Sequence, residues 1–168
     1  MSKAVMLSIR PEWVEKIASG EKTIEVRKTR PKLTPPFMAY IYCSRGRDAR
    51  RLRDSWGKVI GEFTCDRIYK IDKDSTDFLF KVGGLSVYKQ AAEEKCGLRV
   101  AMTDDELHGY LGHCQGYGWH ISDLRIYDQP RELGEFRKPE FPTGLRLEDD
   151  EIKHPPQSWC YVEAMKDE

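Results

Sequence analysis

The sequence predicts an α+β fold, a small β-barrel of five to six strands with short helices at its periphery. Segments with the alternating polar and apolar residues of β-strands occur along the whole chain, and turn residues separate them. The short helical patterns do not alternate regularly with these strands, which argues against a doubly wound parallel sheet. Closing the strands into a barrel would also leave no exposed sheet edge.

The first elements are a strand over 4–9, a helix over 11–19 and a strand over 23–28. Pro11 opens the helix, and Gly20 accepts the left-handed turn that ends it. The apolar residues of this helix recur at helical spacing: Trp13, Val14, Ile17 and Ala18. In the strand over 23–28, apolar Ile24 and Val26 alternate with polar side chains, so we expect one apolar and one polar face.

The later elements follow from the same patterns. They are, in order, a strand over 37–43, an arginine-rich loop over 44–56, a strand over 58–68, helices over 74–82 and 86–95, a short helix after 103, a strand over 116–127, an irregular linker over 129–157 and a last strand over 158–165. Gly83-Gly84 separates the two middle helices, and Thr103 to Glu106 forms a capping box. Gly61 marks a position where the strand over 58–68 can bulge.

Composition favours one domain that spans residues 1–168. The chain lacks an apolar run of about 20 residues and a signal-peptide pattern, so we expect no membrane segment and a cytoplasmic location. Five scattered cysteines without a CxxC pair favour reduced thiols. Lys and Arg exceed Asp and Glu by 8 in residues 1–58, and the reverse holds for the remainder. This split allows a basic face for phosphates, although the two halves could equally pair with each other.

The first candidate site is the run of charged residues after Gly20. Lys22, Thr23, Glu25 and Arg27 fall within six positions, on the predicted polar face of one strand and the turn before it. A lysine near a carboxylate can act as a base or an anchor, and an arginine can bind a phosphate or orient Glu25. An exposed strand with an ordinary Glu–Arg pair would give the same pattern.

Two further groups carry the chemistry of nucleic-acid recognition. Arginines follow the strand over 37–43, close to Tyr40, Tyr42 and Trp56: Arg45, Arg47, Arg50, Arg51 and Arg53. Guanidinium groups contact phosphates and aromatic rings stack on bases, although a solvated helix face would look alike. In the strand over 116–127, Trp119 and His120 point to opposite faces, and His120 is either a proton shuttle or a structural histidine. The spacing of histidines and cysteines matches no zinc pattern, so we expect neither a metal nor a cofactor.

Several segments resemble the ASCH domain family, a branch of the PUA-like barrels. The resemblance begins at Met6 to Pro11 and the GEKTIEVRK run that starts at Gly20, and it continues in order through three later segments. These segments are Val59 to Phe63, Gly118 to Leu124 and Pro155 to Trp159. The resemblance implies a PUA-like barrel whose mouth holds RNA or a modified nucleobase in a Lys/Glu/Arg cleft. Lys22, Thr23, Glu25 and Arg27, the arginine loop, Trp119 and His120 would form the binding residues.

The resemblance also leaves other functions open. Some ASCH relatives hydrolyse the amide of 4-acetylcytidine with a lysine and a threonine, and others are reported to cleave RNA. Lys22 matches the family lysine, but Glu25 stands at the position of the threonine nucleophile. If the chain is a hydrolase, we therefore expect Lys22 and Glu25 to be catalytic, with Glu25 activating a water. A non-catalytic domain that binds a protein partner is the third alternative.

Overall fold

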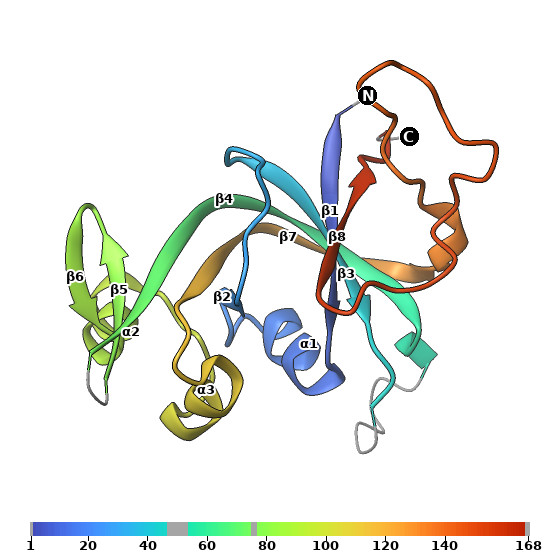
Figure 1. The fold of residues 1–168 in the computed structure, drawn as a ribbon. Helices are drawn as coiled ribbons and strands as arrows, with labels where there is room; N and C mark the ends of the chain where they lie inside the picture. The colour runs from blue at the N-terminus through green and yellow to red at the C-terminus, as the bar shows by residue number, and fades with distance from the viewer. Residues whose placement is uncertain (1, 47–53, 75–76, 167–168) are drawn as a thin grey trace. The chain divides into compact units, whose positions relative to one another are not determined.

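The computed structural model describes residues 2–46, 54–74 and 77–166 (Figure 1). Contacts within the chain divide it into two compact units. Unit 1 comprises residues 1–18, 37–64 and 123–168, and unit 2 comprises residues 19–36 and 65–122. Each unit is therefore built from segments that are far apart in the sequence.

Unit 1 is organised around the buried strand β1 (Lys3–Ile9), which has a neighbour on each side. It pairs in parallel with β3 (Phe37–Cys43) and antiparallel with β8 (Trp159–Glu163). The helix α1 (Pro11–Ala18) follows β1 and buries Pro11, Val14 and Ile17. Tyr40 of β3 packs edge to face against Phe136, with the two ring centroids 4.9 Å apart, within the apolar core of this unit.

Two long strands contribute to both units. These are β4 (Lys58–Asp74) and β7 (Gly116–Arg131), and each passes from one unit to the other along its length. A Cβ atom on Gly61 of β4 would lie 2.5 Å from the carbonyl oxygen of Arg125 in β7. Glycine is required at this position because any side chain would force the neighbouring backbone apart.

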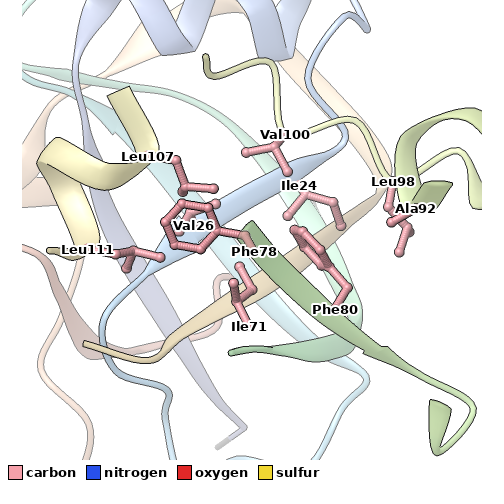
Figure 2. Packing of buried hydrophobic residues seen from close by; sticks show 10 residues of the cluster. All are labelled: Ile24, Val26, Ile71, Phe78, Phe80, Ala92, Leu98, Val100, Leu107 and Leu111. Atoms are coloured by element: carbon pink, nitrogen blue, oxygen red, sulfur yellow. The ribbon is translucent and has the colours of Figure 1, made fainter. Parts of the chain in front are cut away.

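Unit 2 contains the short strand β2 (Ile24–Arg27), which pairs antiparallel with β7. A hairpin of β5 (Asp77–Val82) and β6 (Leu85–Tyr88) extends from β4, and the helices α2 (Lys89–Cys96) and α3 (Asp104–Leu111) follow it. Figure 2 shows Leu107 and Leu111 of α3 pointing towards Val26 in the apolar core of this unit. The core therefore fixes the apolar residues of β2 between a strand partner and a helix.

The α+β class is confirmed, but the predicted closed barrel of five to six strands is not. The described residues form eight strands in one sheet, whose order is β2-β7-β4-β3-β1-β8 with β5 and β6 paired onward from β4. The end strands of this path are not hydrogen-bonded to each other, so the sheet is open. The strands over 4–9 and 37–43 and the capping-box helix were predicted correctly, and the box has both of its hydrogen bonds. The strand predicted over 116–127 starts at the right residue but is shorter than β7.

The helix predicted over 74–82 is wrong, and the helix predicted over 86–95 begins too early. Residues 77–82 form β5, in which Phe78 and Phe80 are buried at alternate positions. Gly83 and Gly84 both have positive φ, and they make the two-residue turn that pairs Val82 with Leu85. The helix α2 begins only at Lys89, after the hairpin ends.

The segment predicted as an irregular linker starts inside β7, which continues to Arg131. A short 3-10 helix η2 (Leu133–Glu135) and an isolated bridge between Arg137 and Glu151 follow. Arg146 then donates hydrogen bonds to Glu140, Asp150 and Glu163 at 2.7 to 3.1 Å, which ties the segment to β8. Within the described ranges, no helix has the length and apolar character needed to span a bilayer.

Candidate functional site

The turn before β2 is fixed by a segment that lies far along the sequence. The guanidinium of Arg99 donates hydrogen bonds to the carbonyl oxygens of Gly20, at 2.7 Å, and of Glu21, at 3.2 Å. Thr23 Oγ1 donates to the carbonyl of Gly97 and accepts from the backbone N–H of Arg99. These contacts set the position of Lys22, which lies between Glu21 and Thr23. Thr23, predicted to bind a ligand, thus has a hydrogen-bonding role within unit 2.

Lys22, Glu25 and Arg27 form a buried ion cluster, called here the Lys22–Glu25–Arg27 cluster. Lys22 Nζ donates to the carbonyl oxygen of Val100 at 2.6 Å and lies 3.7 Å from Glu25 Oε2. Arg27 Nε and Nη2 both donate to Glu25 Oε1, at 3.1 and 2.8 Å. Two cationic groups therefore flank the two oxygens of one carboxylate, an arrangement that can fix its orientation firmly.

The alternative of an exposed strand with an ordinary Glu–Arg pair is excluded, because both faces of β2 are buried. All four residues of β2 are buried, and Lys22, Glu25 and Arg27 have only 2%, 5% and 6% of their surfaces exposed. The backbone of Thr23 and Ile24 donates to the carbonyl of Arg99, so another segment adjoins the start of the strand. Nearby Tyr110 of α3 has a raised pKa, chiefly because it is buried, and the charge of Arg27 opposes this rise.

The strand β7 places His120 and Trp119 beside the cluster. His120 faces Ile24 and Trp119 faces Glu25 in the register of the two strands. The Nδ1 atom of His120 lies 2.6 Å from Asp66 Oδ1, and both side chains are partly exposed. A carboxylate at this distance orients the imidazole and selects its tautomer. Trp119, predicted to be an RNA-binding residue, is fully buried, so its ring has no exposed surface for a ligand to contact.

The arginine loop is described only in part. Arg45 is exposed and belongs to unit 1, whereas Arg47, Arg50, Arg51 and Arg53 lie outside the described residues. Of the aromatic residues expected to stack on bases beside this loop, Tyr40 and Tyr42 are buried, whereas Trp56 is partly exposed. Burial raises the pKa of Tyr42, and the charge of Arg45 lowers it in part. The predicted role of this loop stays a prediction.

Sequence reasoning did not identify Asp66 and Arg99, although both hold parts of the site. Asp66 pairs with His120 across 54 positions, and Arg99 contacts the turn at Gly20 across 79. Exposed cationic side chains continue after β2 in unit 2: Lys28, Arg30 and Lys32. Lys28 Nζ lies 5.5 Å from the centroid of the Tyr110 ring, a cation–π distance. In the part of the chain that the structure describes, no three His, Cys, Asp or Glu side chains gather where they could hold a metal.

Comparison with known proteins adds the family context. The model of the ASCH domain matches residues 7–105 of this chain. The structure is similar to that of ASCH from Zymomonas mobilis, with a TM-score of 0.59 and 18% identity over 95% of this chain and 87% of that one. A tyrosine-to-phenylalanine mutant of the same protein gives a TM-score of 0.60 and 18% identity over 96% and 91%. At this identity the likeness concerns the fold alone. No curated protein matches the chain in sequence.

Proposed function

Since this chain belongs to the ASCH domain family, we propose that it binds RNA or a modified nucleobase through unit 2. The observation that carries the proposal is the Lys22–Glu25–Arg27 cluster, which lies within the matched residues. Moving each of the three charged groups out of water costs several kcal/mol before their mutual attraction is counted. Apolar residues would stabilise a short strand without this desolvation penalty. We therefore infer that a cluster with this cost has a role beyond the stability of the strand.

In the proposed site, exposed residues would contact the ligand and buried residues would hold the strand in position. Exposed Lys28, Arg30 and Lys32 follow the cluster directly and would contact phosphates. Glu25 and Arg27 expose so little surface that a ligand would meet only their edges. Lys22 is still more deeply buried, so its contribution would be to hold the end of β2 in place. The partly exposed His120–Asp66 pair would offer hydrogen bonds to a base edge.

Fluorescence anisotropy of a labelled single-stranded RNA, titrated with the full chain at several salt concentrations, tests this proposal. Neutralising Lys28, Arg30 and Lys32 together to glutamine should weaken binding and reduce the salt slope by about 2, because each lost phosphate contact removes about 0.7 on single strands. The matched control neutralises three other exposed lysines of unit 2 to glutamine: Lys70, Lys81 and Lys95. Equal affinities and slopes for the two triple variants would exclude this surface as the RNA-binding face.

A hydrolase is the second candidate, and the His120–Asp66 pair favours it. An imidazole whose Nδ1 is held 2.6 Å from a carboxylate has its second nitrogen available as a general base. His120 would take a proton from the attacking water as the general base. The substrates to test are those of the family, the acetyl amide of 4-acetylcytidine and the RNA phosphodiester.

An RNA that carries one 4-acetylcytidine, incubated with the protein and followed by intact-mass spectrometry, distinguishes these reactions. Acetyl loss or strand cleavage that disappears in His120→Gln and in Lys22→Ala would establish a hydrolase at this site. Circular dichroism of both variants separates loss of chemistry from loss of fold. Turnover that survives His120→Gln would contradict its role as the base, and unchanged RNA would leave binding as the function.

A further inference from the structure

Unit 1 contains a second candidate site that the proposed function does not use. A cavity of about 510 Å³ opens between β3, β4, β7 and the residues that follow β8. Its polar lining includes Glu62, Arg125, Tyr127, Arg131 and Lys166. Its volume falls in the range of small-molecule pockets, which is roughly 300–1,000 Å³.

The strand β7 places three of these residues side by side. Arg125, Tyr127 and Arg131 stand at odd-numbered positions of one strand, so their side chains share one face. The guanidinium carbons of Arg125 and Arg131 lie 6.0 and 5.3 Å from the centroid of the Tyr127 ring. Two arginines are thus held near one aromatic ring, and such contacts restrict their side-chain freedom.

The one carboxylate in the lining is already engaged. Glu62 Oε2 accepts a hydrogen bond from the Tyr127 hydroxyl at 2.5 Å, and Oε1 lies 3.7 Å from Arg125 Nη1. Burial and the adjacent Glu62 carboxylate both raise the pKa of Tyr127, so this phenol stays neutral and donates its proton. Arg131 also lies 3.9 Å from Glu135, an exposed and therefore well-screened carboxylate. The lining carries three cations and one anion, and its net charge is positive.

We propose that this cavity binds a phosphate group, with Arg125, Arg131 and Lys166 as its ligands, Tyr127 as the residue that positions the two arginines, and Glu62 as an anion that weakens the attraction for phosphate. Arginine donates through a planar fork that matches the oxygens of a phosphate, and lysine adds a point charge. The cavity has room for a mononucleotide. The same chemistry would accept either the phosphate of a free nucleotide or a phosphate of an RNA chain. The inference does not rest on RNA binding by unit 2.

Two-dimensional ¹H–¹⁵N spectra of the full chain test this site directly. Inorganic phosphate and cytidine 5′-monophosphate are added separately, and the shifts of the Arg125, Tyr127 and Arg131 amides are followed. Saturable shifts at these residues are expected, with about tenfold weaker binding in Arg131→Gln. The control Lys153→Gln removes a cation of unit 1 that does not line the cavity and should leave the affinity unchanged.

In Glu62→Gln we expect a higher affinity for phosphate, a result that misfolding could not produce. Glutamine retains an acceptor for Tyr127 but removes the negative charge, so both phosphate probes should bind several-fold more tightly. Three results would each overturn the proposal. They are weaker phosphate binding in Glu62→Gln, equal affinities in Arg131→Gln and Lys153→Gln, and the absence of amide shifts at the cavity residues. A short RNA that displaces the nucleotide from the cavity would identify RNA as the source of the phosphate, and nucleotide binding without displacement would identify a free nucleotide.

Discussion

The buried carboxylate of Glu25 offers a direct measurement of what stabilises unit 2. Its Oε1 accepts from Arg27 at 2.8 and 3.1 Å, and its Oε2 lies 3.7 Å from Lys22 Nζ. Glu25→Gln keeps the size of the side chain and one acceptor oxygen but removes the negative charge. Two cationic side chains would then remain buried beside a neutral amide.

The expected loss follows from this geometry. Removing one partner of a buried ion pair costs about 3–5 kcal/mol, because the remaining charge stays desolvated. Glutamine still accepts a hydrogen bond from Arg27, so we expect the lower end, about 3 kcal/mol of unfolding free energy. With a urea m-value of roughly 2 kcal/mol/M, the unfolding midpoint should fall by about 1.5 M.

Urea unfolding followed by tryptophan fluorescence measures this loss, since buried Trp119 lies opposite Glu25 in the sheet. The control is Glu93→Gln in the same unit, which breaks a helical i,i+4 pair with Lys89 and should cost only about 0.3–0.5 kcal/mol. In an Arg27→Met background the cost of Glu25→Gln should shrink, because fewer buried cations depend on the carboxylate. A loss of unfolding free energy below about 1 kcal/mol in Glu25→Gln would show that the cluster is not a desolvated ion cluster. Equal losses in Glu25→Gln and Glu93→Gln would show the same.

Gly61→Ala should lower the free energy of unfolding by about 2 kcal/mol, because the added Cβ would lie 2.5 Å from a carbonyl oxygen, and thermal unfolding would detect this. Gly109→Ala should raise it by about 0.5–1 kcal/mol in the same assay, since this helical glycine faces open space. Burial raises the pKa of Cys65 to about 12, so its thiol should resist maleimide at pH 8 while exposed Cys96 reacts; equal rates would contradict this. The same shift predicts that stability falls as pH rises from about 9 towards 12, because the unfolded thiol loses its proton first, and urea midpoints across that range would show it. Arg146→Gln should speed chymotrypsin cleavage between residues 140 and 150, since three carboxylates lose their shared partner.

Local signals in the sequence predicted the elements whose stabilising contacts are themselves local. The strand over 37–43 has the bounds that its run of aromatic and apolar residues suggests. The helix α3 begins where the capping box predicts, because both hydrogen bonds of that box join Thr103 to Glu106, three positions away. The β5–β6 hairpin was missed because Gly83-Gly84 was interpreted as a break between helices, although two glycines with positive φ also form a hairpin turn.

The candidate site could be predicted only as a list of residue types. Its charged residues are close in sequence, but the buried ammonium of Lys22 donates to the carbonyl of Val100, which is 78 positions away. The pairing of His120 with Asp66 likewise joins two strands that a single sequence does not place side by side. Alternation of polar and apolar residues predicts two faces for β2, and it carries no information on what covers the polar one.

The arrangement around β1 sets the order in which this protein can fold as the ribosome makes it. The strand that pairs with β1 on one side ends at Cys43, whereas the strand on the other side begins only at Trp159. Unit 2 ends at residue 122, so its chain is complete while β8 is still to be translated. During that interval one hydrogen-bonding edge of the buried β1 has no partner strand from its own sheet. Nascent chains are therefore exposed to premature pairing at β1, and slow translation before residue 159 would lengthen that exposure.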